Sequence, residues 1–282
     1  MSISQEQRPG IPLLGAQSPI TERQLAEGPR VLVYETPDDA ASAMAKATVS
    51  KLAHFDTPTM LLATGNTMQP YYRKLIELSR TDRTIHDLLC RTMYWQLDNY
   101  VYRPDAYPHG SDETNFSRIL RRDFIDPTGI PRDHFNPLIG YTYAPNAMAG
   151  MYAKGLSMRQ MTVVNFGLGP LPEVHHAYMR QGTPFDTDVH YVPKLEEGVI
   201  ARNKDRGERT PTEAITIGHK TYENARHIQV LCFGSEKAAS LARALYAEVS
   251  PQIVATGLRR PGLGQVEYFV DRAAFQSVAP EL

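Results

Sequence analysis

Short apolar runs alternate along the chain with alanine-rich or amphipathic segments. The apolar runs predict strands, and the segments between them predict helices. Such alternation is typical of an α/β protein, so we expect a doubly wound, mostly parallel sheet. The expected strands cover residues 30–34, 60–63, 92–97, 161–166, 227–233 and 266–270, and the expected helices cover residues 40–55, a segment from Pro70 onward, 113–124, 146–160 and 235–249.

The remaining segments lack clear periodicity. Residues 1–29 are rich in Gln, Ser, Pro and Gly, and we expect an irregular N-terminal extension there. Residues 30–282 then form a single α/β domain. Within it, a turn is expected at 126–131, a charged surface excursion at 196–212, and a helix or turn at 212–222. Asp38 and Asp39 are expected to cap the first helix, where acidic side chains favour the helix dipole.

The strand at 60–63 runs directly into Thr64, Gly65, Asn66 and Thr67, and Pro70 then starts a helix. Backbone N–H groups at the start of a helix are unpaired, and the helix dipole adds positive charge there. Small side chains let an anion approach the backbone, and hydroxyl groups donate further hydrogen bonds. We interpret this turn as a phosphate site; the alternative is a plain strand-to-helix connection.

Other predicted strands also end in polar or glycine-rich turns, near Asp98, Gly167 to Gly169, and Gly234 to Lys237. Ligands of such sheets bind outside the carboxyl ends of the strands, so neighbouring turns would converge on one crevice. Asp98 is a candidate base for a proton next to a carbonyl or imine carbon; its alternative is a turn cap. Lys237 is a candidate to bind an anion at the start of its helix; its alternative is a surface lysine whose ammonium group reaches solvent.

Composition narrows the classes of function. The chain has 282 residues, 42% of them hydrophobic and 22% charged, with a net charge of −1. This balance does not indicate a nucleic-acid or membrane partner. No apolar run has membrane-spanning length, no signal peptide is recognised, and Cys90 and Cys232 indicate no disulfide framework, so a cytoplasmic protein is expected.

Two adjacent histidines, His175 and His176, follow Glu173. Adjacent residues on a regular element point apart and no carboxylate has matching spacing, so no metal is expected. A Glu173–His176 pair on a helix would support proton transfer or helix stability alone.

Several motifs resemble the glucosamine-6-phosphate deaminase family in order and spacing, and the related 6-phosphogluconolactonases share part of the pattern. The resemblance covers residues 31–271. It implies a Rossmann-like fold of the glucosamine-6-phosphate deaminase, ribose-5-phosphate isomerase and CoA-transferase type. The motifs are Ala-Thr-Gly-Asn-Thr at 63–67, Gln-Leu-Asp-Asn-Tyr-Val at 96–101, Phe-Gly-Leu-Gly at 166–169, Ala-Ile-Thr-Ile-Gly at 214–218 and Gly-Ser-Glu-Lys-Ala at 234–238.

The resemblance implies roles for individual residues and no cofactor. The 64–67 turn, Arg202 and Lys237 would hold the phosphate, with Gly167 and Gly169 in the binding turn. A guanidinium fork and an ammonium group suit a dianionic phosphate. Asp98 would move a proton between C2 and C1 of the opened sugar.

The chain departs from the family after Gly169. Leu171, Glu173 and Tyr178 stand where the deaminases have the Asp, His and Glu that open the sugar ring and support the amine chemistry. The leucine side chain has no group that can take up or release a proton. Glu173, His175 or His176 would have to replace that set, and the prolines at 170 and 172 indicate an altered backbone.

Three hypotheses follow. The first is an enzyme of carbohydrate or amino sugar metabolism, an isomerase or deaminase acting on a hexose or hexosamine 6-phosphate. The second is a non-catalytic sugar-phosphate-binding protein, a sensor or a degenerate paralogue. The third is a lactonase-like hydrolase, weakened by the loss of the family's histidine at Glu173. In each case the partner is a small-molecule sugar phosphate, and assembly into a homo-oligomer is left open.

Overall fold

The structure is a computed structural model that describes residues 18–25, 28–105, 114–169, 176–205, 211–276 and 278; the side chains of 202–205 are not described. In this part of the chain an eight-stranded sheet has the order β1-β2-β11-β10-β7-β3-β4-β6. Only β1 runs antiparallel to its neighbour. The expected doubly wound, mostly parallel sheet is therefore confirmed. The strands are β1 (Thr21–Gln24), β2 (Arg30–Tyr34), β3 (Thr59–Leu62), β4 (Met93–Gln96), β6 (Phe135–Asn136), β7 (Val163–Gly167), β10 (His227–Cys232) and β11 (Gln265–Asp271).

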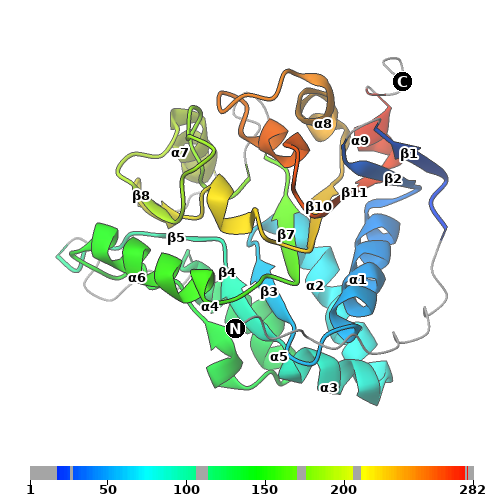
Figure 1. Cartoon of the computed structure of the whole chain (residues 1–282), viewed down its shortest axis with the longest axis horizontal. Coiled ribbons are helices and arrows are strands. Elements are labelled where there is room, and N and C mark those ends of the chain that lie inside the picture. Colours follow the sequence, from blue (N-terminus) through cyan, green and yellow to red (C-terminus); the bar gives the residue numbers. More distant parts are fainter. Residues whose placement is uncertain are drawn as a thin grey trace.

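Helices cover the sheet (Figure 1). α1 packs on β10, β11 and α2, and α2 packs on α3. The α-helices are α1 (Pro37–Ala53), α2 (Gln69–Thr81), α3 (Arg83–Arg91), α4 (Phe116–Leu120), α5 (Asp126–Thr128), α6 (Pro145–Ser157), α7 (Glu197–Asp205), α8 (Ala238–Tyr246) and α9 (Arg272–Phe275). Shorter turns are η1 (Asn66–Met68), the π-helical η2 (Arg121–Ile125), η3 (Arg132–His134), η4 (His219–Tyr222), η5 (Ser235–Lys237) and η6 (Val254–Arg259).

The order of the strands reverses at β3. The next strand of the main sheet, β4, pairs on one side of β3, and β7 pairs on the other. The chains leaving β3 and β7 therefore turn away from each other at their carboxyl ends. In doubly wound sheets such a point opens the crevice in which ligands bind.

A small second sheet flanks this crevice. It has the order β5 (Asp98–Tyr100), β9 (Ala214–Thr216) and β8 (His190–Val192), with antiparallel pairs. Figure 1 shows β5 and β8 with α6 and α7 on the opposite side from α1 and α2. Only Leu97 separates β4 from β5, so the chain leaves the main sheet and enters the small one at Asp98. Asp98 therefore lies at the junction of the two sheets.

The cap of α1 differs from the expectation. Thr36, rather than Asp38 or Asp39, is the N-cap residue, and its hydroxyl group accepts from the N–H of Asp39 at 3.2 Å. The Asp39 carboxylate accepts from the N–H of Thr36 in return, also at 3.2 Å. This reciprocal pair is a capping box, in which the acidic residue occupies the third helical position.

Four further segments correct the sequence-based expectations. Within residues 1–29, β1 pairs with β2, so that stretch is not irregular throughout. The helix predicted at 113–124 begins at Phe116 and continues through η2 and α5, into the expected 126–131 turn. The surface excursion at 196–212 contains α7, and the segment 212–222 contains β9 before η4.

Length and exposure explain these differences. Three of the four β1 residues are exposed, so that edge strand carries no apolar run. β8 and β9 have three residues each, which is too short for a periodic pattern to indicate a strand.

Candidate active site

A cavity of about 390 Å³ opens at the carboxyl ends of β3, β7 and β10. This volume is in the range of small-molecule sites. The structure therefore brings the predicted turns together around one space. Its lining includes eight of the residues singled out from the sequence: Thr64, Gly65, Asn66, Thr67, Asp98, Gly167, Gly169 and Lys237.

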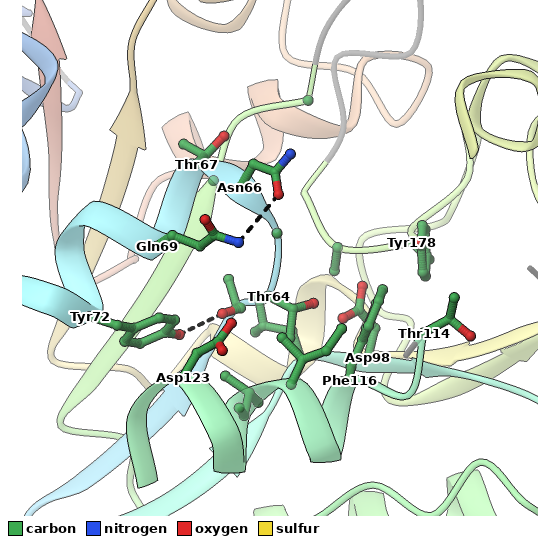
Figure 2. Close-up of a pocket in the computed structure, with 18 of the residues that line it drawn as sticks. Thr64, Asn66, Thr67, Gln69, Tyr72, Asp98, Thr114, Phe116, Asp123 and Tyr178 are labelled. Atoms are coloured by element: carbon green, nitrogen blue, oxygen red, sulfur yellow. Dashed lines mark hydrogen bonds between the residues drawn. The ribbon is translucent and has the colours of Figure 1, made fainter. Parts of the chain in front are cut away.

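The 64–67 turn joins β3 to η1 and α2. Gly65 has a φ of 105°, a conformation that favours glycine, and its carbonyl group accepts from the N–H of Met68 at 3.0 Å. The hydroxyl group of Tyr72 donates to the carbonyl group of Ala63 (Figure 2). A methyl group on Gly167 would lie 3.5 Å from the Cβ of Thr67, so the turns after β3 and β7 are adjacent.

Lys237 connects the turns after β7 and β10. Its ammonium group donates to the main-chain carbonyl of Leu168 at 2.5 Å. Lys237 is in η5, directly before α8, where the helix dipole disfavours a cation. A bound anion would offset that cost.

The turn after β10 is held by Asp271, which the sequence did not mark. The Asp271 carboxylate accepts from the N–H of Gly234 at 3.1 and 3.2 Å and from the N–H of Ala274 at 2.8 Å. It thereby caps α9 and fixes the turn that carries Lys237. Gly234 has a φ of 90°, so this turn also requires a glycine.

Asp98 is buried, with 5% of its surface exposed, yet its side chain lines the cavity. β5 holds its backbone opposite Thr216, and Gln96 donates to its main-chain carbonyl at 2.7 Å. Burial raises the pKa of Asp98 to about 7. A carboxyl group with such a pKa can both take and return a proton near neutral pH.

Two aromatic rings line the same cavity as Asp98. The rings of Phe116 and Tyr178 are stacked, with centroids 5.7 Å apart and planes 24° apart, and both residues line the cavity. The Tyr178 hydroxyl group donates to the hydroxyl group of Tyr100, and the N–H of Tyr178 donates to Thr216 at 3.2 Å. Figure 2 shows Asp98 and Phe116 on one side of Thr64, and Tyr72 and Asp123 on the other.

His176 lies apart from this arrangement. Its side chain is completely buried and packs on the ring of Phe166, with centroids 4.7 Å apart. It is not among the described residues that line the cavity. Ala177, with a φ of 52°, turns the chain between His176 in the core and Tyr178 at the cavity.

Other predicted residues are only partly described. Glu173 and His175, with Leu171, lie outside the described residues. Arg202 is in α7, whose side chains from 202 onward are not described. Val199 of the same helix lines the cavity, so α7 borders the candidate site.

Sequence reasoning missed several lining residues. Arg122 and Asp123, in η2, form a salt bridge at the cavity. No sequence motif marks these two residues. Only their position in the helix predicted at 113–124 could have suggested that they lie near the site. The other missed residues that line the cavity include Gln69, Tyr72, Thr114, Phe116, Ile119, Leu120, Ala177 and Val199.

Two features are absent from the part of the chain that the structure describes. No group of three or more His, Cys, Asp and Glu side chains is arranged to hold a metal ion. Likewise, none of the helices there combines the length and apolarity needed to span a bilayer.

Curated relatives resemble the chain over most of its length. It is 29% identical over 253 residues to a glucosamine-6-phosphate deaminase of Halalkalibacterium halodurans, covering 86% of this chain and 95% of the relative. It is 27% identical over 228 residues to a glucosamine-6-phosphate deaminase of Staphylococcus aureus, covering 77% and 84%. A comparison with models of known protein families gives no match.

Solved structures show the same fold. A structure described as a monomeric glucosamine-6-phosphate deaminase has a TM-score of 0.77 and 22% identity, covering 88% of this chain and 99% of its own. A 6-phosphogluconolactonase from Trypanosoma brucei has a TM-score of 0.67 and 20% identity, covering 90% and 100%. The resemblance to this group of proteins, predicted from the motifs, is confirmed.

Proposed function

We propose, from the resemblance to glucosamine-6-phosphate deaminases, that this chain is an isomerase or deaminase of a hexose or hexosamine 6-phosphate. The names of its relatives agree with an enzyme. One observation carries the proposal. A buried carboxyl group, that of Asp98, shares a cavity with a glycine turn at the start of a helix and with Lys237.

The 64–67 turn and Lys237 bind the phosphate in this proposal. Backbone N–H groups at η1 and the hydroxyl groups of Thr64 and Thr67 donate to the phosphate oxygens. The ammonium group of Lys237 supplies a positive charge beside the Gly167–Gly169 turn. Arg202 is proposed as a second cation, from the resemblance and from the position of α7 beside the cavity.

Asp98 acts as the base. In its ionised form it takes the proton from C2 of the opened sugar. The electron pair of the C–H bond forms a double bond between C1 and C2, while the π pair of the C1 carbonyl moves to O1, which takes a proton from an acid group or water. Asp98 then returns the proton to C1 while the hydroxyl or amino group on C2 releases a proton to water, which leaves a carbonyl or imine at C2. When C2 carries nitrogen, water adds to the imine and ammonia leaves, giving the ketose phosphate. A base with a pKa near the working pH suits both transfers.

Opening of the sugar ring needs a second acid–base group. Glu173 and His175 are proposed for it, because they lie within four residues before Ala177, which lines the cavity. His176 itself is packed on Phe166 in the core, which argues against its proposed catalytic role.

Incubation with glucosamine 6-phosphate in deuterated water tests the proposal. Release of ammonia with deuterium in the product supports a deaminase, and deuterium exchange without ammonia supports an isomerase. Fructose 6-phosphate is included so that an isomerase specific for neutral sugars is detected. Binding measured by thermal shift, with neither signal, would favour a non-catalytic sensor. Hydrolysis of 6-phosphogluconolactone would favour the lactonase instead.

A further inference from the structure

We propose that Phe116 and Tyr178 are positioning residues for Asp98. Their stacked rings form the part of the cavity wall that keeps water from the Asp98 carboxyl group. The catalytic use of Asp98 rests on the proposed function, whereas the exclusion of water by this wall does not.

The geometry of the wall supports this role. Phe116 begins α4, and Tyr178 follows the turn at Ala177, so two distant segments supply the two rings. Tyr178 is fixed at both ends: its N–H donates to Thr216 and its hydroxyl group donates to Tyr100. Thr216 is also the cross-strand partner of Asp98. The ring of Tyr178 is thus held by the same strand pair that places the carboxyl group.

Neither ring supplies a charge. Phenylalanine carries no ionisable group, and burial raises the pKa of the Tyr178 phenol well above its ordinary value, with the Asp98 charge among the further causes. The wall therefore acts on Asp98 by removing water rather than by pairing with it. A carboxyl group that loses its hydration favours the protonated form.

Other ionisable groups surround the same space and must be considered. Tyr152 of α6 lies near Asp98, and its pKa is raised above the ordinary range chiefly by burial. Tyr100 of β5 receives the Tyr178 hydrogen bond. Lys237, Arg122 and Asp123 line other parts of the cavity. Burial is nevertheless the cause that raises the pKa of Asp98.

The test is a carbon-13 NMR titration of aspartate carboxyl groups in the intact protein, with the Asp98 signal assigned by its loss in Asp98→Asn. In Phe116→Ala and Tyr178→Ala the Asp98 midpoint is expected to fall by about one pH unit or more, because water reaches the carboxyl group. Tyr178→Phe keeps the ring and should leave the midpoint within a few tenths of a unit. Tyr141→Ala is the matched control, an exposed tyrosine that is not part of the cavity lining.

Several outcomes would overturn the inference. One is an unchanged midpoint in both folded alanine variants. Another is a shift in Tyr178→Phe as large as that in Phe116→Ala, which would assign the effect to the hydroxyl pair. Phe116→Leu, a milder variant expected to give a smaller fall, replaces Phe116→Ala if the latter does not fold.

The pH profile of C2-proton exchange separates this inference from the proposed function. If the Asp98 midpoint falls and the acid limb of the exchange profile moves to lower pH with it, the wall and the role of Asp98 as base are both supported. If the midpoint falls in variants whose exchange profile does not move, the wall is confirmed and the role of Asp98 as base is wrong. If the midpoint does not move while Asp98→Asn abolishes exchange, the wall is wrong and the base stands.

Discussion

The ammonium group of Lys237 donates to the main-chain carbonyl of Leu168, and this contact joins two turns that lie 69 positions apart in sequence. It places a cation over the turn after β7, next to the threonine-rich turn after β3. The Lys237 side chain therefore joins the turns after β7 and β10 beside the proposed phosphate site.

Replacement of Lys237 by methionine is expected to weaken binding of a hexose or hexosamine 6-phosphate by about 10- to 100-fold, because a charged hydrogen bond contributes about 1.5–3 kcal/mol. Isothermal calorimetry measures the dissociation constant. Lys220→Met is the control, since Lys220 is exposed and lies outside the cavity lining. Equal affinities in the two variants would remove Lys237 from the phosphate site.

Replacement of Asp98 by asparagine should abolish C2-proton exchange while sugar-phosphate binding is retained. The amide has the shape of the carboxyl group but accepts no proton, and the β5–β9 backbone pairing does not involve the side chain. A loss of about 10³-fold or more is expected for an essential base. NMR of the substrate in deuterated water gives the rate. Undiminished exchange would show that another group is the base.

The pH dependence of wild-type exchange follows from the same residue. Asp98 must be ionised to take the C2 proton, and burial raises its pKa to about 7. The exchange rate should therefore rise with pH through about 7 and level off above it. Substrate affinity measured over the same range is the control, because protonation of the phosphate below neutral pH would lower binding instead. An acid limb near pH 4 would show that Asp98 is solvated in the working enzyme.

The sequence predicted the main sheet well because its central strands are buried on both faces. All four residues of β3 are buried, and such strands give continuous apolar runs. The small sheet gave no comparable signal. The three residues of β9 are also buried, but they are too few for a run to be recognised between charged segments.

The sequence predicted correctly which residues meet at the cavity where a turn follows a strand directly. Thr64, Asp98 and Lys237 each stand at or just after a strand end, and strand order then brings them together. Phe116 enters from a helix whose position relative to the sheet depends on packing, which no local motif encodes. Conversely, His176 is adjacent to cavity residues in sequence but points into the core, because Ala177 has a left-handed conformation.

A pair of glycine variants tests the strain in the 64–67 turn. Gly65 has a φ of 105° with no atom within 4 Å of an added Cβ, so Gly65→Ala is strained through its backbone alone. A loss of about 1–3 kcal/mol in the free energy of unfolding, or a moved turn with weaker phosphate binding, is expected. Gly150→Ala, in the middle of α6 and also without a close neighbour, should be neutral or stabilising by up to about 1 kcal/mol. Denaturant unfolding measures both; equal effects would contradict the assignment of strain.

The burial of Asp98 also has a consequence for stability that needs no substrate. Its pKa in the folded protein is about 7, against an ordinary value of 3.8. At pH values between these two pKa values, Asp98 has lost its proton in the unfolded chain but keeps it in the folded protein. The contribution of Asp98 to the free energy of unfolding is therefore largest below about pH 4, and it is lost as the pH rises to about 7.

Asp98→Asn removes this dependence, because the amide does not ionise. The variant should gain stability relative to wild type as the pH rises from about 4 to about 7, by roughly 4 kcal/mol in total, and the difference should stay constant above pH 8. Urea unfolding of both proteins at pH 4, 6 and 8 measures it. Asp133→Asn, in η3 at an exposed position, is the control and should show no such rise. A constant difference between Asp98→Asn and wild type across this range would mean that the Asp98 carboxyl group ionises as it does in water.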